Sequence, residues 1–191
     1  MENTAYRLSD ILITAELDRR PVRPHDPELG HGSLRLVSDS MCSGRAALLQ
    51  ATSDMALDLT QGTTAGVSVI HERPAGAAMV WEAVSGIKID LIHGELPRFN
   101  SPCGYTIDQK ALHLFADPGR YYTYMPTFDP PMFELLAVPM FTRHRKPWGT
   151  LWVFVQDAQT QLDREDADQL SMLVNFTMSA LDLQDRSPKG H

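Results

Sequence analysis

Apolar residues recur with a helical period in a segment that ends near Thr60. They share one face of a repeat of about 3.6 residues, and they are Leu48, Ala51, Met55, Ala56 and Leu59. We therefore predict a helix here, with Gly62 as the left-handed residue that caps it. The same spacing predicts a shorter helix near the N-terminus, at Leu8, Ile11, Leu12 and Ala15.

A longer helix is predicted near the C-terminus. Asp163 and Asp166 match a capping box, in which each side chain accepts a hydrogen bond from the other residue's backbone. Two apolar stripes follow on roughly opposite sides: Leu170, Val174, Met178 and Leu181, then Leu173, Phe176, Ala180 and Leu183. A sheet can bury one stripe, so the second needs another partner. We expect a twofold copy of the chain to cover it, with Leu8 and Leu12 of the N-terminal helix as the alternative.

Alternating apolar and polar residues predict β-strands between these helices. The expected strands span residues 65–71, 77–84, 87–91, 135–142 and 149–156. Short turns join the first three and the last two, which implies antiparallel pairing, and helices at both ends of this order would cover one sheet face, as in an α+β domain. Residues 92–134, where we expect a short helix at 108–115, are too many for a routine connection and indicate a functional loop.

Proline and glycine residues divide the chain near its start. Three prolines and two glycines interrupt regular structure between positions 21 and 32. We interpret residues 1–32 as a helical arm with a proline-rich linker, residues 33–186 as the folded domain, and residues 187–191 as a flexible tail.

The composition narrows the classes of function. The 191 residues carry a formal net charge of -7, and the basic cluster at 143–146 is interpreted as a hairpin tip. An acidic surface repels a phosphate backbone, so we expect no nucleic-acid partner. The sequence has no apolar run of the roughly 20 residues that a membrane span needs. It begins without the pattern of a signal peptide and has two cysteines, so we expect a cytoplasmic protein with reduced thiols.

Several motifs occur in a particular order along the chain. After a helix and hairpin at 48–82 they are SPCG (101–104), ADPGRYY (116–122), ELLAVPMF (134–141), WGTLWVFVQD (148–157) and LDREDADQLSMLVNF (162–176). In this order they resemble a GAF domain over about residues 33–183, and in particular the GAF domains found beside bacterial histidine kinases.

The resemblance implies both an architecture and a role. It implies a GAF-like central antiparallel sheet with the terminal helices on one face and a loop-covered ligand pocket on the other. It also implies a small-molecule-binding sensory or regulatory module of bacterial signal transduction. Such a module would be a homodimer through its terminal helices and would act on a histidine kinase or another output protein. Because a fold does not fix its ligand, the ligand is not identified by this resemblance.

Residues on the expected pocket side are the candidates for ligand binding. Tyr121 and Tyr124 lie in the segment that would cover the pocket, and rings with polar tips suit a small-molecule site. The full set is Met79, Trp81, Cys103, Tyr105, Tyr121, Tyr124 and Trp152. An equal alternative is that the tyrosines only pack the loop onto the sheet, and a ligand-free dimerisation module would follow from a collapsed pocket.

Cys103 admits several chemical interpretations. We interpret it as a small packed residue in a turn, where Pro102 fixes the chain and Gly104 supplies an unusual backbone angle. Bilin-binding GAF domains commonly have histidine after the attachment cysteine, whereas Gly104 follows here. GAF enzymes that reduce methionine sulfoxide use several loop cysteines, and this loop has one. A thiol-dependent redox enzyme, with Cys42 as the second thiol, is the alternative function.

The sequence shows no complete catalytic or cofactor constellation. His93 or His113 could ligate a haem, but lone histidines are more often surface or hydrogen-bonded residues. No cluster of His, Cys or Asp has the spacing of a zinc site. We therefore expect no enzymatic activity, no bound metal, and neither haem nor bilin as a cofactor.

Overall fold

A six-stranded antiparallel sheet forms the centre of the protein. A computed structural model describes residues 6–23, 43–125 and 127–186. The strands are β1 (Thr64–His71), β2 (Ala78–Gly86), β3 (Glu95–Pro97), β4 (His113–Ala116), β5 (Glu134–Phe141) and β6 (Pro147–Val155). They lie in the order β3-β2-β1-β6-β5-β4, so the N- and C-terminal strands of the sequence meet at the β1–β6 pair in its middle.

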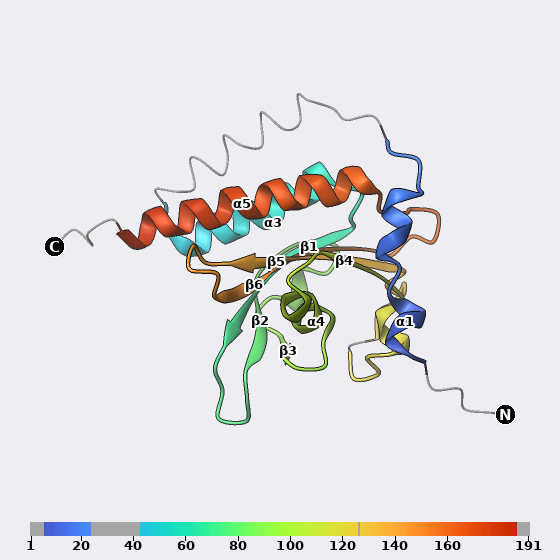
Figure 1. Ribbon diagram of the computed structural model, residues 1–191, viewed down its shortest axis with the longest axis horizontal. Coiled ribbons are helices and arrows are strands. Elements are labelled where there is room, and N and C mark those ends of the chain that lie inside the picture. The colour runs from blue at the N-terminus through green and yellow to red at the C-terminus, as the bar shows by residue number, and fades with distance from the viewer. Residues whose placement is uncertain (1–5, 24–42, 126, 187–191) are drawn as a thin grey trace.

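Helices and loops cover the two faces of this sheet differently. The helices are α1 (Leu8–Ile11), α3 (Arg45–Leu59), α4 (Pro102–Gln109) and α5 (Arg164–Arg186), with short 3-10 turns η1 (Thr14–Asp18), η3 (Ile89–Leu91) and η4 (Pro118–Arg120). The long helices α3 and α5 lie side by side on one face, and α4 lies with the longer loops on the other (Figure 1). The predicted α+β class, with helices on one face and loops on the opposite face, is confirmed.

Both faces of the sheet are buried, so successive residues of one strand belong to two different apolar clusters. On β6, Leu151 and Val153 belong to the cluster beneath α3 and α5, which we call the helix-side cluster. Trp152 and Phe154 belong to the cluster beneath α4 and the loops, which we call the loop-side cluster. The helix-side cluster is mainly aliphatic and the loop-side cluster is rich in aromatic rings, so only the second offers flat surfaces to a ligand.

α3 covers much of the second stripe of α5. The hydroxyl oxygens of Thr52 in α3 and Thr177 in α5 are 2.9 Å apart, which shows how closely the helices approach. Leu173 and Ala180 are therefore buried within one chain, whereas Leu183 is 54% exposed. The expectation that a second chain has to bury the whole stripe is wrong for Leu173 and Ala180, because it ignored a second helix on the same face. The dimer itself stays a prediction.

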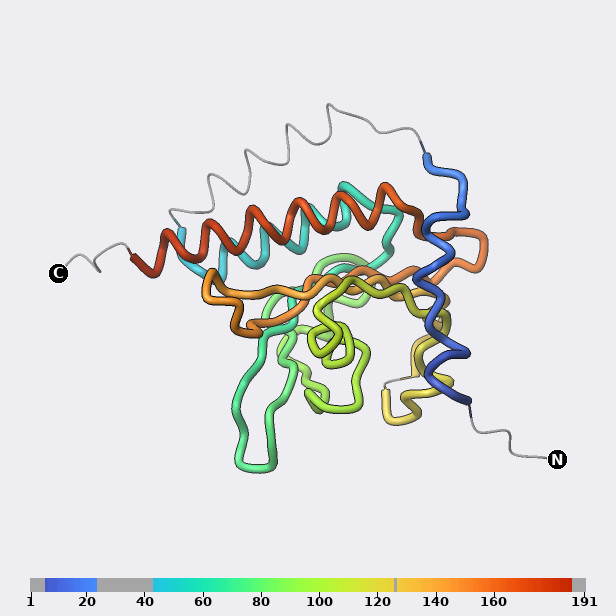
Figure 2. Tube along the Cα trace, in the orientation of Figure 1, coloured from blue at the N-terminus to red at the C-terminus, as the bar shows by residue number. Residues whose placement is uncertain are grey.

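The N-terminal helix does not cover that stripe either. Leu8 and Leu12 pack against the loop-side cluster instead. The segment of residues 6–23, which we call the arm, runs past the edge of the sheet at β4 from the loop side to the helix side (Figure 2). Leu12 forms a bridge with Phe115, and Leu17 is fully buried in the helix-side cluster. The predicted boundary between residues 32 and 33 and the predicted tail at 187–191 lie outside the described residues and stay predictions.

The ends of the long helices were predicted with mixed success. The backbone N–H of Asp166 donates to Asp163 Oδ1 at 3.1 Å, and that of Asp163 donates to Asp166 Oδ2 at 2.8 Å, so the capping box is confirmed. The predicted cap at Gly62 is wrong. α3 ends at Leu59, and Thr60 continues in extended backbone with φ of -124°.

Two shorter elements were predicted wrongly. Residues 87–91 form no strand, because Gly86 turns the chain with φ of +96° and the 3-10 turn η3 follows. The predicted helix at 108–115 is also wrong. Ser101 Oγ caps α4 by accepting from the N–H of Gly104 at 3.0 Å, so the helix begins earlier. It stops at Lys110, whose φ is +54°, and His113 then begins the strand β4.

The close packing of Trp152 on Gly66 generates a stability prediction. A Cβ atom at position 66 would lie 2.7 Å from Trp152 Cη2 and 2.8 Å from the carbonyl oxygen of Ala83. We expect Gly66→Ala to lower the free energy of unfolding in urea by about 1–3 kcal/mol, because the ring and the backbone have to move. Gly119→Ala is the matched control, since its nearest atom would be 3.8 Å away. Equal stability of the two variants would contradict the prediction.

Candidate functional site

An apolar pocket lies on the loop side of the sheet. Four aromatic residues, Trp81, Phe128, Trp152 and Phe154, contribute to its lining. The remaining lining residues are Leu91, Leu96, Pro102, Cys103, Met125, Met132 and Leu135. Its volume is about 30 Å³, and no charged side chain among the described residues lines it. A lining of apolar and aromatic side chains without a charged group favours an apolar occupant.

The aromatic wall is held rigidly by the sheet. Trp152 lies flat against the backbone of Gly66, and its Nε1 donates to Ser68 Oγ at 2.7 Å. Phe154 follows two residues later on the same face, and the two rings are stacked with 5.8 Å between centroids and 5° between planes. Phe128 adds a third ring, 5.5 Å from that of Phe154. The alternation of side chains along β6 therefore places the rings of Trp152 and Phe154 on the same face, and Phe128, from a loop, completes the wall.

Trp81, on β2, forms another part of the wall. A Cβ on Gly94 would overlap the Trp81 ring, with 2.6 Å to Cε3, so the glycine lets the backbone lie directly against the indole. The N–H of Trp81 also donates to the carbonyl of Gly94 at 2.9 Å. The ring is thus positioned by backbone packing rather than by a polar side chain.

Cys103 lies at the start of α4, against the pocket. It is 6% exposed, and the hydroxyls of Thr150 and Ser68 approach its thiol. Burial raises the pKa of the thiol, and the two hydroxyls offset only part of this effect. The interpretation of Cys103 as a packed residue agrees with this burial. The expected unusual angle at Gly104 is wrong, because this glycine is helical and is needed where the carbonyl of Arg98 packs against it.

The predicted site residues divide into two groups. Trp81, Cys103 and Trp152 line the pocket, and Met79 is buried in the same cluster without lining it. The three tyrosines do not line it. They lie beside it: Tyr105 stacks edge-on to His113, Tyr121 stacks edge-on to Tyr122, and Tyr124 is 41% exposed. Whether any of these residues binds a ligand stays a prediction.

Several lining residues were missed by the sequence reasoning. Phe154 could have been found, because it follows Trp152 by two residues in a predicted strand. Met125, Phe128 and Met132 come from a segment of irregular backbone without periodicity, so no local signal placed them near the sheet. Tyr122, which belongs to the loop-side cluster without lining the pocket, is 2% exposed, and burial raises the pKa of its hydroxyl well above the ordinary range.

A second hollow adjoins the pocket. Its volume is about 250 Å³, and it shares Met125, Phe128 and Met132 with the pocket. Asp117 and Arg120 lie on its outer side. We call it the outer groove. Two methionines and one phenylalanine therefore lie between the apolar pocket and a larger, more polar space.

Histidine and carboxylate side chains do not gather around this pocket in the described part of the chain. Within the residues that the structure describes, no three His, Cys, Asp or Glu side chains come together to hold a metal ion. His93 and His113 both lie outside the pocket lining. In the same described residues, no helix is long and apolar enough to cross a membrane.

Comparison with known proteins identifies the fold. No protein-family model and no curated protein matches the chain. Among solved structures, the GAF domain of an Acinetobacter phosphoenolpyruvate-protein phosphotransferase matches with a TM-score of 0.66 and 14% identity, over 87% of this chain and 100% of that one. The chromophore-binding domain of a bacteriophytochrome from R. palustris matches with a TM-score of 0.65 and 9% identity, over 86% of this chain and 65% of that one. The chain has a GAF-like fold.

Enzymes of the same fold correct one expectation. Free methionine-R-sulfoxide reductase from Neisseria meningitidis, solved with its substrate, matches with a TM-score of 0.63 and 16% identity, over 88% of this chain and 98% of that one. The reductases of Staphylococcus aureus and Thermoplasma acidophilum match at 14% and 17% identity. The expectation that the chain is not an enzyme rested on the lack of a complete catalytic constellation in the sequence, and it is wrong, because this fold houses catalysis as well as sensing.

His113 generates a prediction about pH. Burial lowers its pKa from the ordinary 6.5, and the backbone of Ala111 offsets part of this effect. The fold thus holds His113 neutral, and as the pH falls below 6.5 the unfolded chain binds the proton first. The free energy of unfolding should therefore fall from pH 6.5 downward until the pH reaches the lowered pKa of the folded state.

Urea unfolding of the unmutated protein and of His113→Gln at pH 7.5 and 5.5 measures this effect. The variant should lose less stability between the two pH values, because position 113 no longer titrates. A variant that loses as much stability as the unmutated protein would show that His113 does not cause the loss.

Proposed function

We propose that the chain is a sensory or regulatory module that binds a small, uncharged, apolar molecule in its loop-side pocket. The observation that carries this proposal is an aromatic pocket separated from a larger groove by three movable side chains, Met125, Phe128 and Met132. Methionine side chains are unbranched and reorient easily, so this wall can give way to a ligand. The closed pocket then widens toward the outer groove.

The chemistry of the lining supports an uncharged ligand. Trp81 and Trp152 offer ring faces, and the nearest ionisable group in the wall, the Cys103 thiol, is kept protonated by its raised pKa. A charge moved into this pocket would lose its hydration without gaining a partner, which makes a charged ligand unfavourable. A flat, neutral molecule would instead stack on the rings.

Output through α5 is the second part of the proposal. The ligand pocket and α5 lie on opposite faces of the same sheet, and β6 contributes side chains to both (Figure 1). A change in the loop-side packing of β6 would therefore reach the helix layer. We propose a partner protein as the receiver, with a histidine kinase as the candidate suggested by the sequence motifs.

A thiol-dependent enzyme is the second candidate function, because the Cys103 side chain lines the pocket of a fold shared with sulfoxide reductases. Attack of the thiolate on a sulfoxide would release the thioether and leave a sulfenic acid, which a second thiol or an external dithiol has to reduce. Turnover of methionine sulfoxide with dithiothreitol, lost in Cys103→Ser, would establish this candidate. The raised pKa of Cys103 makes ligand binding the better supported function.

The pocket proposal predicts selective binding of neutral aromatic molecules. Indole should bind and quench tryptophan fluorescence, whereas indole-3-acetate, which carries a carboxylate, should bind at least about tenfold more weakly. Leu96→Phe, which fills the pocket from the short edge strand β3, should weaken indole binding about tenfold or more. Ile87→Phe is the control, because Ile87 is 66% exposed and does not line the pocket.

Three outcomes would count against this prediction. Equal binding of the charged and neutral probes would exclude an apolar site. Equal affinities of the two variants would place the site elsewhere. If native mass spectrometry of fresh protein and a broad panel of small molecules both show no ligand, the binding function itself is wrong, and the ligand-free alternative follows.

We also propose a homodimer through a narrower surface of α5 than the sequence suggested. Met172 and Leu183 are 40% and 54% exposed, and the half-buried Phe176 lies between them on the same helix face.

Light scattering should give twice the 21.3 kDa of one chain. Phe176→Glu should shift the protein to the monomer mass, since a charge would then enter the interface, while Phe99→Glu, at an exposed position on the loop side, should not. A monomeric unmutated protein at tens of micromolar would exclude the dimer.

A further inference from the structure

The arm contacts both layers of the molecule within a few residues. At its start, the Tyr6 ring lies 4.1 Å from the guanidinium carbon of Arg120, which lines the outer groove. Ile11 is then buried in the loop-side cluster. Beyond the bridge to β4, Leu17 is buried in the helix-side cluster. The blue segment of Figures 1 and 2 shows this path past the edge of the sheet.

The far end of the arm is fixed by Arg20. Its guanidinium donates to both carboxylate oxygens of Glu134, at 2.8 and 2.9 Å, and to the carbonyl of Leu162 at 2.6 Å. The Arg20 side chain is 8% exposed, so this bidentate pair is shielded from solvent. The N–H of Leu162 also donates to Glu134 at 2.9 Å. Arg20 therefore ties the arm to the start of β5 and to the segment that leads into α5.

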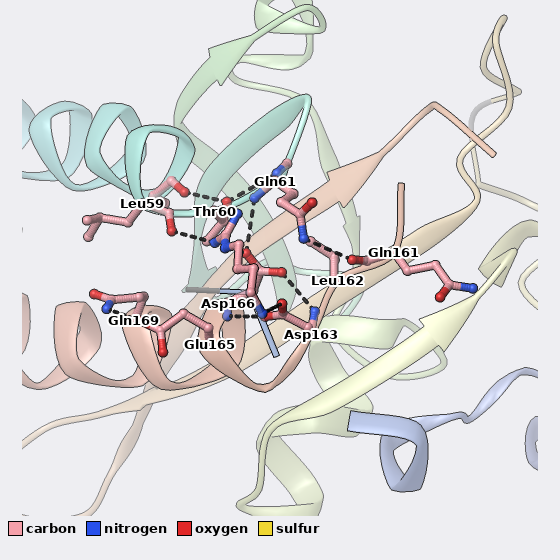
Figure 3. A network of polar contacts seen from close by, with 12 residues as sticks. Leu59, Thr60, Gln61, Gln161, Leu162, Asp163, Glu165, Asp166 and Gln169 are labelled. Carbon is pink, nitrogen blue, oxygen red and sulfur yellow. Dashed lines mark hydrogen bonds and ion pairs between the residues drawn. The ribbon is translucent and has the colours of Figure 1, made fainter. Parts of the chain in front are cut away.

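Arg23 makes a second tie at the first turn of α5. Its guanidinium donates to Asp166 at 2.5 Å and to the carbonyl of Leu59 at 2.9 Å, and its backbone N–H donates to Asp163 at 3.0 Å. Figure 3 shows Asp166 at the centre of this network, between the end of α3 and the start of α5. Asp166 also accepts from the N–H of Gln61 at 3.0 Å. We call the contacts of Arg20 and Arg23 the clasp.

The clasp consists of charged hydrogen bonds, although apolar side chains at these positions would stabilise the fold equally well. Asp166 is fully buried, and a buried ion pair generally stabilises a fold no more than apolar residues of the same volume. Charged hydrogen bonds are directional, so they hold the arm in one defined position. The arm has little structure of its own, a four-residue helix and a five-residue 3-10 turn, so its position depends on the contacts at its two ends and along β4.

We propose that the arm couples the ligand pocket to the start of α5, so that a change at one end alters how firmly the other end is held. The inference rests on the proposed function for its biological use, although the mechanical coupling can be measured without ligand. The pocket reaches the arm through the loop-side cluster, and through the adjoining outer groove, where Arg120 contacts Tyr6; the arm reaches α5 through the clasp. By linkage, the effect runs equally in both directions.

Amide hydrogen exchange of two variants tests the coupling in the free protein. Arg23→Met with Asp166→Asn removes the Arg23 part of the clasp together with both charges of that ion pair, so no buried charge is left without a partner. Tyr6→Ala breaks the contact at the other end, at a residue that is 42% exposed, so the domain stays folded. Arg73→Gln is the control, because it breaks an exposed ion pair with Glu95 that the arm does not touch.

Each variant should change exchange at the end it does not touch. The clasp variant should speed exchange about fivefold or more in the loop segments beside the pocket, at residues 121–125 and 128–132, and Tyr6→Ala should do so in the first turn of α5. The control should change neither region. Changes confined in both variants to the mutated end would overturn the proposal, because the arm would then only fill space at each end.

Indole binding adds the functional half of the test. The clasp variant should change the indole dissociation constant about fivefold or more, in either direction, whereas Arg73→Gln should leave it unchanged. Coupled exchange without any indole binding would keep the arm proposal and reject the apolar ligand. Indole binding of equal affinity in all variants, together with uncoupled exchange, would keep the proposed function and reject the role of the arm.

Discussion

A sheet buried on both faces is the constraint on which the rest of this structure depends. Each strand residue has to meet an apolar neighbour above or below, so the alternation along β6 assigns Leu151 and Val153 to the helices and Trp152 and Phe154 to the pocket. The two layers are therefore mechanically joined through single strands. A protein built this way cannot repack one face without disturbing the backbone that supports the other.

The pocket follows from how the loop-side face is filled. Wide aromatic rings lie on glycine positions, as Trp152 does on Gly66 and Trp81 on Gly94, and rings of this size leave gaps that the covering loops do not fill completely. The small apolar pocket between them is such a gap. Its wall toward the outer groove is made of loop residues, which are more easily displaced than strand residues, so the same packing that stabilises the face also leaves one side of it adjustable.

The sequence predicted what depends on local pattern and missed what depends on distant partners. The α5 capping box of Asp163 and Asp166 and the long strands followed from spacing alone. β4 was mistaken for helix because His113–Ala116 is too short and too apolar to show a period. The cover over Leu173 and Ala180 comes from α3, more than 100 positions away in the chain, and the Arg20–Glu134 pair joins residues 114 positions apart. No periodicity carries such information.

The arm also covers one edge of the sheet. An edge strand presents unpaired N–H and C=O groups on which a strand from another molecule can add. At one edge this risk is small, because β3 has three residues and ends in Pro97. At the other edge the arm occupies the open side of β4, where Leu12 bridges Phe115 and the N–H of Ile13 donates to the carbonyl of Leu114 at 2.9 Å. Without the arm, β4 would be a template for strand addition, so the arm keeps the folded sheet from aggregating edge to edge.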